Sequence, residues 1–220
     1  MPPELPRGIV RMEAGPLAAN CYLFTCPGTT ATAVIDPGGD APGIIDLIER
    51  SGLSPVAIVN THAHVDHIAA NRELVTRYGV PLAIHTRDGD ALNDGVRNLS
   101  DFGFGSVESP PADRVLDDGE SLEIGSCRLL VIATPGHTPG GICLYWEGGD
   151  DGPGVVFTGD TLFAGGVGRA DFPGGSMSTL LASIRDRLYV LPPPTLVLPG
   201  HGPATTIGRE RASNPFVRYP

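Results

Sequence analysis

The chain has 220 residues, of which 41% are hydrophobic and 18% charged, a composition typical of a globular protein with a substantial core. Its formal net charge of −10 argues against nucleic acid or an anionic membrane as a partner, because both attract a basic surface. All the basic residues are arginines, which excludes mechanisms that need a Schiff-base lysine or a phosphate-loop lysine.

The sequence carries no signal for export or for membrane insertion. No apolar run approaches the length of a transmembrane helix, and the first thirteen residues, MPPELPRGIVRME, lack the apolar core of a secretory peptide. We therefore expect a cytoplasmic protein. Cys21, Cys26, Cys127 and Cys143 lack the CxxC spacing of a thiolate zinc site, and in the cytoplasm we expect them to be reduced and packed.

Short apolar runs bounded by Gly, Pro, Asn and Asp predict the strands of the fold. In chain order they cover residues 19–25, 31–35, 55–60, 82–85, 121–124, 127–133, 141–146, 154–158 and 195–198. Apolar residues at helical spacing predict helices over 41–51, 68–78 and 176–189. Some strands are paired in sequence and others alternate with helices, without repeats or a long linker. We expect one domain over residues 1–220, of the α+β class, with packed sheets inside and helices outside.

Residues 93–113 do not fit this pattern. They are rich in Gly, Pro, Ser and Asp, and Phe102 and Phe104 are set among glycines. A loop this long is uncommon inside a compact domain and often acts as a lid or a binding loop. A flexible surface insertion is an equally good interpretation.

The segment Thr61-His62-Ala63-His64-Val65-Asp66-His67 is the strongest local motif. Residues two apart in an extended segment face the same side, so His62 and His64 can bind one ion. Asp66 and His67 follow as the chain turns toward a helix, where they can reach a neighbouring ion. Imidazole combined with carboxylate is the ligand set of borderline cations such as zinc or iron.

Four predicted strands are each followed by a candidate ligand. These strands precede His62, His137, Asp160 and His201, and a glycine directly precedes the last three. In sheet proteins, sites gather beyond one end of the strands, so we expect these side chains to converge.

Several of these residues also have a purely structural interpretation. Taken alone, His137 and His201 would be structural histidines, Asp160 would be a turn former, and only their place beside the clustered motif favours ligation. Asp36, in VIDPGG, also lies at a strand end, where it could orient a metal ligand or simply form an Asp-Pro-Gly turn.

On these motifs the sequence resembles the metallo-β-lactamase-fold superfamily, and within it the glyoxalase II (hydroxyacylglutathione hydrolase)-like branch in its short bacterial form. The matching segments keep the family's order. They are ANCYLF at 19–24, VIDPGG at 34–39, THAHVDH at 61–67, TPGHTPG at 134–140, TGDTLF at 158–163, GRADFPGG at 168–175 and PGHGPATTIGRERASNPF at 199–216. The resemblance implies a four-layer αβ/βα sandwich with metals at one edge.

The resemblance also implies a division of the ligands between two divalent ions. His62, His64 and His137 would hold the first ion, Asp66, His67 and His201 the second, and Asp160 would bridge them. Zinc is the expected metal, with iron or manganese as alternatives. In this scheme a hydroxide between the ions attacks the substrate carbonyl, and Asp66 and Asp160 act as catalytic residues that orient it.

The expected reaction is hydrolysis of the thioester of an S-2-hydroxyacyl thiol, such as S-lactoylglutathione or a relative. The given sequence ends with NPFVRYP, and we expect the protein to lack the helical C-terminal domain that binds glutathione in full-length relatives. The GRADF segment replaces a family lysine, so Arg169 is the candidate cation there. We take Arg169, Phe102 and Phe104 as candidate substrate contacts, with the thiol left open.

The motifs are also compatible with other functions. An iron-dependent persulfide dioxygenase shares the fold and a GR-x-DF segment, but it uses one iron held by two histidines and an aspartate, whereas PGHGP here retains His201. A lactonase, a β-lactamase or an inactive metal-binding protein fits less well. The catalytic readings share a small-molecule substrate, and none of them sets the oligomeric state.

Overall fold

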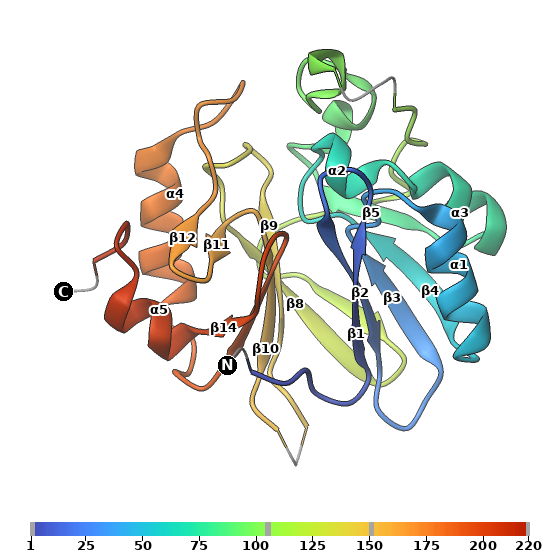
Figure 1. Cartoon of the computed structure of the whole chain (residues 1–220), viewed down its shortest axis with the longest axis horizontal. Helices are drawn as coiled ribbons and strands as arrows, with labels where there is room; N and C mark the ends of the chain where they lie inside the picture. Colours follow the sequence, from blue (N-terminus) through green and yellow to red (C-terminus); the bar gives the residue numbers. More distant parts are fainter. Residues whose placement is uncertain (1–2, 104–106, 150–151, 219–220) are drawn as a thin grey trace.

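Two six-stranded sheets face each other in the computed structural model, which describes residues 3–103, 107–149 and 152–218 (Figure 1). The first sheet has the order β1 (Ile9–Ala14), β2 (Ala19–Thr25), β3 (Ala31–Ile35), β4 (Ser54–Val59), β5 (Leu82–His85) and β6 (Arg114–Leu116). Strands β3 to β6 run parallel, while β1 and β2 are antiparallel to their neighbours.

The second sheet holds the later part of the chain. Its order is β14 (Thr205–Thr206), β13 (Leu196–Pro199), β10 (Val155–Gly159), β9 (Ile142–Trp146), β8 (Cys127–Ala133) and β7 (Ser121–Ile124). Only β10 and β13 are parallel neighbours, so β8, β10 and β13 all run in the same direction. A small hairpin, β11 (Leu162–Phe163) and β12 (Gly166–Val167), follows β10.

Helices cover the outer face of each sheet (Figure 1). The first sheet carries α1 (Ala41–Arg50), α2 (Val65–Ile68) and α3 (Asn71–Tyr78), followed along the chain by the 3₁₀ turns Gly89–Asn93 and Ser100–Phe102. The second sheet carries α4 (Met177–Ser183), which continues into a π-helical turn over Ile184–Leu188, and α5 (Ile207–Ser213). Separate apolar clusters lie under each helical layer. The predicted four-layer sandwich is therefore confirmed.

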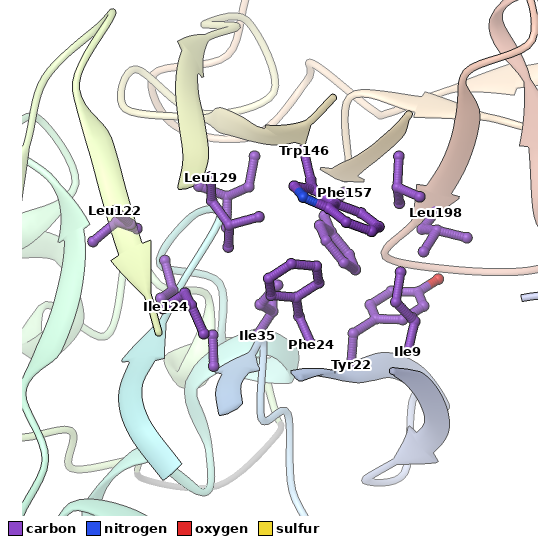
Figure 2. Close-up of a cluster of buried hydrophobic side chains, with 14 of the residues drawn as sticks. Ile9, Tyr22, Phe24, Ile35, Leu122, Ile124, Leu129, Trp146, Phe157 and Leu198 are labelled. Carbon is purple, nitrogen blue, oxygen red and sulfur yellow. The ribbon is translucent and has the colours of Figure 1, made fainter. Parts of the chain in front are cut away.

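The central core lies between the two sheets and is rich in aromatic side chains (Figure 2). Phe24 of β2 is fully buried and meets Trp146 and Phe157 of the second sheet edge-to-face, with ring centroids 5.3 and 6.0 Å apart. Tyr22 contacts Phe157 in the same way at 5.3 Å. Alternate residues of a strand point to opposite faces, so this core uses one face of each sheet and leaves the other for the helices.

The predicted strands are all present, with bounds that differ by at most one residue at either end. The prediction of one helix over 68–78 is wrong, because the chain forms the short α2 and then α3, separated by Ala69 and Ala70. Strands β1, β6, β11, β12 and β14 and helix α5 were not predicted, because they are short or lack a clean apolar pattern. No helix within residues 3–103, 107–149 and 152–218 is long and apolar enough to cross a bilayer.

The expectation of four reduced cysteines is wrong for two of them. Cys26 lies just after β2 and Cys127 begins β8, and the two form a disulfide with Cα atoms 5.6 Å apart. The turn before Cys127 packs against the turn after Cys26, since a Cβ on Gly125 would lie 3.4 Å from that of Cys26. Two sequence-distant turns thereby meet where the sheets face each other. Cys21 and Cys143 are free and buried, as expected.

Candidate active site

The seven predicted ligand side chains all lie at one edge of the sandwich, beyond the carboxyl ends of strands. They are His62 and His64 after β4, Asp66 and His67 on α2, His137 after β8, Asp160 after β10 and His201 after β13. The parallel course of β3 to β5 gathers one set of strand ends, and the common direction of β8, β10 and β13 gathers the other.

His62, His64 and His137 form one cluster, here called the three-histidine group. Their ring centroids lie 4.5 to 4.8 Å apart, and the three residues are 1%, 3% and 4% exposed. The Nε2 atom of each is buried and has no hydrogen-bond partner in the described protein. His137 donates its Nδ1 proton to the Arg169 carbonyl oxygen at 2.6 Å, which leaves the Nε2 lone pair free for a ligand role.

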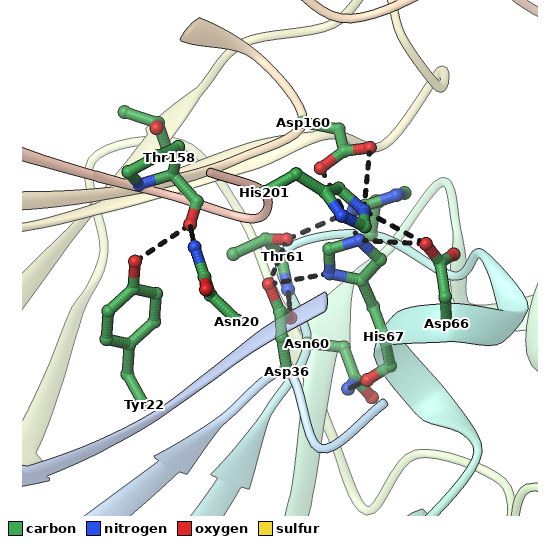
Figure 3. A network of polar contacts seen from close by, with 12 residues as sticks. Asn20, Tyr22, Asp36, Asn60, Thr61, Asp66, His67, Thr158, Asp160 and His201 are labelled. Atoms are coloured by element: carbon green, nitrogen blue, oxygen red, sulfur yellow. Dashed lines mark hydrogen bonds and ion pairs between the residues drawn. The ribbon is translucent and has the colours of Figure 1, made fainter. Parts of the chain in front are cut away.

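Asp36 and Thr61 orient two of the histidines. Asp36 accepts hydrogen bonds from the Thr61 backbone N–H and hydroxyl, each at 2.7 Å. Because the hydroxyl proton goes to Asp36, the Thr61 oxygen accepts from Nδ1–H of His62 at 3.1 Å. Asp36 Oδ2 also lies 3.1 Å from Nδ1 of His67 (Figure 3). A carboxylate in this place sets ring orientation and tautomer.

Asp66, His67 and His201 form a second cluster, here called the mixed group. Nε2 of His201 lies 3.0 Å from Asp66 Oδ2, and Nε2 of His67 lies 3.8 Å from the same oxygen. Four ligands around one tetrahedral zinc ion stand roughly 3.3 Å apart at the usual bond lengths, so these separations suit a shared ion. His67 is fully buried, whereas the His201 side chain is 30% exposed.

Asp160 lies within 3.8 Å of histidines from both groups, and Figure 3 shows it beside His201 and His67. Its Oδ1 is 3.4 Å from Nε2 of His67, and its Oδ2 is 3.7 Å from Nε2 of His137 and 3.8 Å from Nε2 of His201. Gly159, with φ +45°, provides the turn that delivers this carboxylate. A Cβ at Gly200 would lie 2.3 Å from Asp160 Oδ1, so only glycine allows the two loops this close.

The electrostatics of the two groups differ. Burial, together with the neighbouring histidines, lowers the pKa of His62 well below 6.5 and that of His64 to about 3. The mixed group behaves oppositely. Burial acts to lower the pKa of His67, but Asp66, Asp160 and Asp36 outweigh it and raise that pKa well above 6.5. The hydrogen bond that His201 Nε2–H donates to Asp66 Oδ2 raises the pKa of His201.

The donor set fits divalent metal ions. Three trios of ligand atoms, each within 4.8 Å, can be drawn: His62, His64 and His137; His62, His67 and Asp160; and Asp66, His67 and His201. Buried imidazole nitrogens normally have a partner, so the cluster of unpartnered Nε2 atoms points to a cation at their centre. Imidazole and carboxylate together bind zinc, iron and manganese.

The predicted substrate contacts lie around this edge without a common partner. The Arg169 guanidinium is exposed, donates two hydrogen bonds to Asp171 and stacks over the Phe172 ring at 4.3 Å. Phe172 in turn contacts His64, with centroids 5.6 Å apart. Phe102 is 63% exposed at the end of the second 3₁₀ turn, and Phe104 lies outside the described residues. A lid formed by residues 93–113 stays a prediction.

Several residues at this edge were missed by sequence reasoning. Asp88 is 1% exposed and accepts hydrogen bonds from two different loops of the site. It follows β5 by three residues, so the strand-end rule that singled out the other ligands could have found it. Asn60 donates to the His67 carbonyl oxygen at 2.9 Å, and the backbone contact of Arg169 carries no sequence signal at all.

Comparisons with known proteins agree with the fold. Residues 14–201 match the family model described as the metallo-beta-lactamase superfamily. A probable metallo-hydrolase, YqgX of Bacillus subtilis, is 40% identical over 94% of this chain and 96% of the relative. A hydroxyacylglutathione hydrolase, GloC of Haemophilus influenzae, is 37% identical over 90% of this chain and 92% of the relative.

Solved structures show the same architecture. BLEG-1, described as a B3 metallo-β-lactamase, superposes with a TM-score of 0.89 at 37% identity, covering 95% of this chain and 99% of that one. TTHA1623 in a di-iron-bound form gives 0.83 at 38% identity, covering 94% and 100%. ETHE1 from Myxococcus xanthus gives 0.75 at 27% identity, covering 94% and 83%.

Proposed function

Because the chain belongs to the metallo-β-lactamase superfamily and its relatives include a probable metallo-hydrolase and a hydroxyacylglutathione hydrolase, we propose that it cleaves the thioester of S-2-hydroxyacyl thiols. The observation that carries this proposal is Asp160: its Oδ1 faces His67 of the mixed group, and its Oδ2 faces both His137 of the three-histidine group and His201 of the mixed group. One carboxylate between two ligand trios is the arrangement for a pair of ions that share it. The similarity to a hydroxyacylglutathione hydrolase supports the thioester as substrate.

Two bound divalent ions would supply a water activated near neutral pH and a Lewis acid for the substrate carbonyl. The chain's own residues would set where that chemistry occurs. His62 and His64 present neutral imidazoles because burial lowers both pKa values. Burial acts to raise the pKa of Asp160 and Asp66, but His67 lowers both, so both carboxylates are charged and can orient a water or accept its proton.

The surroundings of the site favour a small substrate. Asp66, Asp160 and His201 retain partial exposure, while the three-histidine group is buried, so a substrate would approach from the mixed group's side. The charge of −10 gives no support to nucleic acid or an anionic membrane as a partner. We propose that the acyl carbonyl lies against the two trios, with the thiol toward the rim that carries Arg169.

A thioester panel measured together with metal content tests this proposal. The metal-loaded protein is offered S-lactoyl, S-mandeloyl and S-acetyl derivatives of several low-molecular-weight thiols, and released thiol is followed with a chromogenic reagent. We expect two equivalents of metal, thiol release, and a strong preference for 2-hydroxyacyl groups. Asp160→Asn should remove the activity, whereas Asp186→Asn, which changes an exposed carboxylate paired with Arg185, should not. A fully loaded protein that releases no thiol from any member would refute the proposal.

Persulfide oxidation is the second candidate, and the structural similarity to ETHE1 is the observation that favours it. It predicts one iron per chain and oxygen uptake with glutathione persulfide. Against it stands the mixed group, where His67 and His201 both face Asp66 and complete a second trio. Oxygen uptake by the same samples with glutathione persulfide would identify a dioxygenase. Hydrolysis of a β-lactam by these samples would identify a lactamase, and neither result is expected of the thioesterase.

A further inference from the structure

We propose that Asp88 is a positioning residue that assembles the three-histidine group. It lies three residues beyond β5, on the first sheet, and its backbone N–H donates to the His85 carbonyl oxygen at 3.0 Å. Its side chain is 1% exposed and reaches across the opening between the sheets. The inference rests on the proposed metal role of that group.

Asp88 connects the two loops that carry the three histidines. One oxygen, Oδ1, accepts from the Gly140 backbone N–H at 2.7 Å, and the other, Oδ2, accepts from the Thr138 hydroxyl at 2.7 Å. Both donors belong to the loop that carries His137. Oδ2 also accepts from the backbone N–H of Ala63 at 3.3 Å, which is the residue between His62 and His64.

The chain around Asp88 is shaped for this contact. A Cβ on Gly140 would lie 2.6 Å from the backbone nitrogen and Oδ1 of Asp88, so the close approach requires glycine. The three hydrogen bonds that the Asp88 side chain accepts come from neutral donors of the two loops, and they fix both loops to one rigid group.

The two sheets reach the three-histidine group separately, and this makes a link between them necessary. His62 and His64 come from the first sheet and His137 from the second. The Ile142 N–H to Thr61 carbonyl bond, at 2.9 Å, holds the bases of the two loops. Asp88 holds their outer parts, directly beside the histidines. Loss of an outer partner of this kind typically weakens metal binding by about 10–100-fold.

Asp88 is specific to one of the two groups. No hydrogen bond or ion pair joins its side chain to Asp66, His67 or His201 in the parts of the chain that are described. A positioning role therefore predicts a selective loss at the three-histidine group. A general contribution to folding predicts an equal loss at both groups.

Zinc titration in single-group backgrounds tests this selectivity. His201→Ala removes a ligand of the mixed group and His64→Ala removes one of the three-histidine group, so each background reports mainly on the other group. Asp88→Asn keeps an acceptor for Gly140 but turns an amide toward Ala63 N–H. We expect it to weaken zinc binding about 10-fold or more in the His201→Ala background. In the His64→Ala background the change should stay within about threefold.

Three controls keep the result interpretable. Asp113→Asn alters a carboxylate that accepts from Leu82 N–H at the other end of the same sheet, and it should change neither affinity. Thr138→Val removes a single donor to Asp88, should give the same selectivity with a smaller loss, and should be non-additive with Asp88→Asn. Unfolding of the zinc-free variants by circular dichroism measures any loss of fold separately.

Unchanged zinc affinity of the three-histidine group in Asp88→Asn, or an equal loss at both groups, would overturn the inference. These outcomes are read from zinc binding alone. A chain that binds two ions and releases no thiol therefore refutes the thioesterase proposal while the role of Asp88 is still decided.

Discussion

The two ends of the sandwich are held together by different means. At the metal edge, buried carboxylates such as Asp36 and Asp88 collect backbone and hydroxyl donors from several loops. At the opposite end, the two sheets are joined by the Cys26–Cys127 disulfide between two turns. Strand direction separates them, because β2 ends and β8 begins at the end away from the ligands.

This difference indicates at which end of the sandwich substitutions can be made without loss of activity. Polar networks at the metal edge hold side chains whose lone pairs have no other partner, so errors of position there affect ligand geometry directly. The far end contributes loop closure and apolar packing, which act on the unfolded chain and the core. Substitutions at the first end should therefore change turnover and metal binding, and those at the second should change stability.

Metal removal should have the largest effect of all. With each ion at about 1,000 times its dissociation constant, binding stabilises the folded state by roughly 4 kcal/mol per ion. For a chain of this length we expect dialysis against a chelator to lower Tm by roughly 15–30 °C and to abolish turnover. Differential scanning calorimetry before and after zinc is restored measures this. An unchanged Tm after metal removal would contradict the prediction that metal ions bound by the ligand cluster stabilise the fold.

Asp160→Ala should have the largest effect of the single substitutions on turnover. It removes the carboxylate that faces both groups, so we expect turnover to fall about 10³-fold, or roughly 4 kcal/mol in activation free energy. Steady-state kinetics with metal analysis on the same sample measures it. If Asp160→Ala holds only one ion and still retains more than a tenth of the wild-type turnover, the two ligand groups act independently and this prediction is wrong.

Loss of the disulfide should lower stability and spare the site. The linked residues are 101 positions apart, and the chain-entropy model gives a loss of about 4–5 kcal/mol for a loop of this length. The double substitution Cys26→Ser and Cys127→Ser should shift the denaturant midpoint accordingly, while turnover stays within about twofold. Reductant should destabilise the wild-type chain and leave the double variant unchanged. A large fall in turnover at full zinc occupancy would break the separation of the two ends.

Proton release should distinguish the two ligand groups, with the smallest effect. Neighbouring carboxylates raise the pKa of His67 well above 6.5 and also raise that of His201, so His67 carries a proton near pH 7 without metal and zinc must displace it from the mixed group. His62 and His64 have lowered pKa values and are already neutral. The zinc affinity of the mixed group should therefore rise with pH through the neutral range. The zinc affinity of the three-histidine group should depend less on pH. Calorimetry of the His64→Ala and His201→Ala variants in buffers of different ionisation enthalpy measures this, and equal release from both would contradict it.

Much of the fold could be predicted from the sequence because its strands are strongly apolar and sharply bounded. Segments such as 19–25 and 154–158 are buried almost throughout, and an apolar run of this length between turn residues indicates a strand. Edge strands β1, β6 and β14 were not predictable, since β1 is only partly buried and β6 and β14 have three and two residues. The break between α2 and α3 was also missed, because apolar spacing continues through it.

The ligand cluster was anticipated from spacing and from placement beyond strand ends, and the chain does bring those side chains together. Both signals are local, because a strand end and a two-residue period are written in consecutive residues. The Cys26–Cys127 pair, the bonds of Asp88 to Thr138 and Gly140, and the Arg169 carbonyl beside His137 arise from segments 32 to 101 positions apart. Which distant turns and loops meet is decided by the packing of one sheet on the other, and only the tertiary structure contains that.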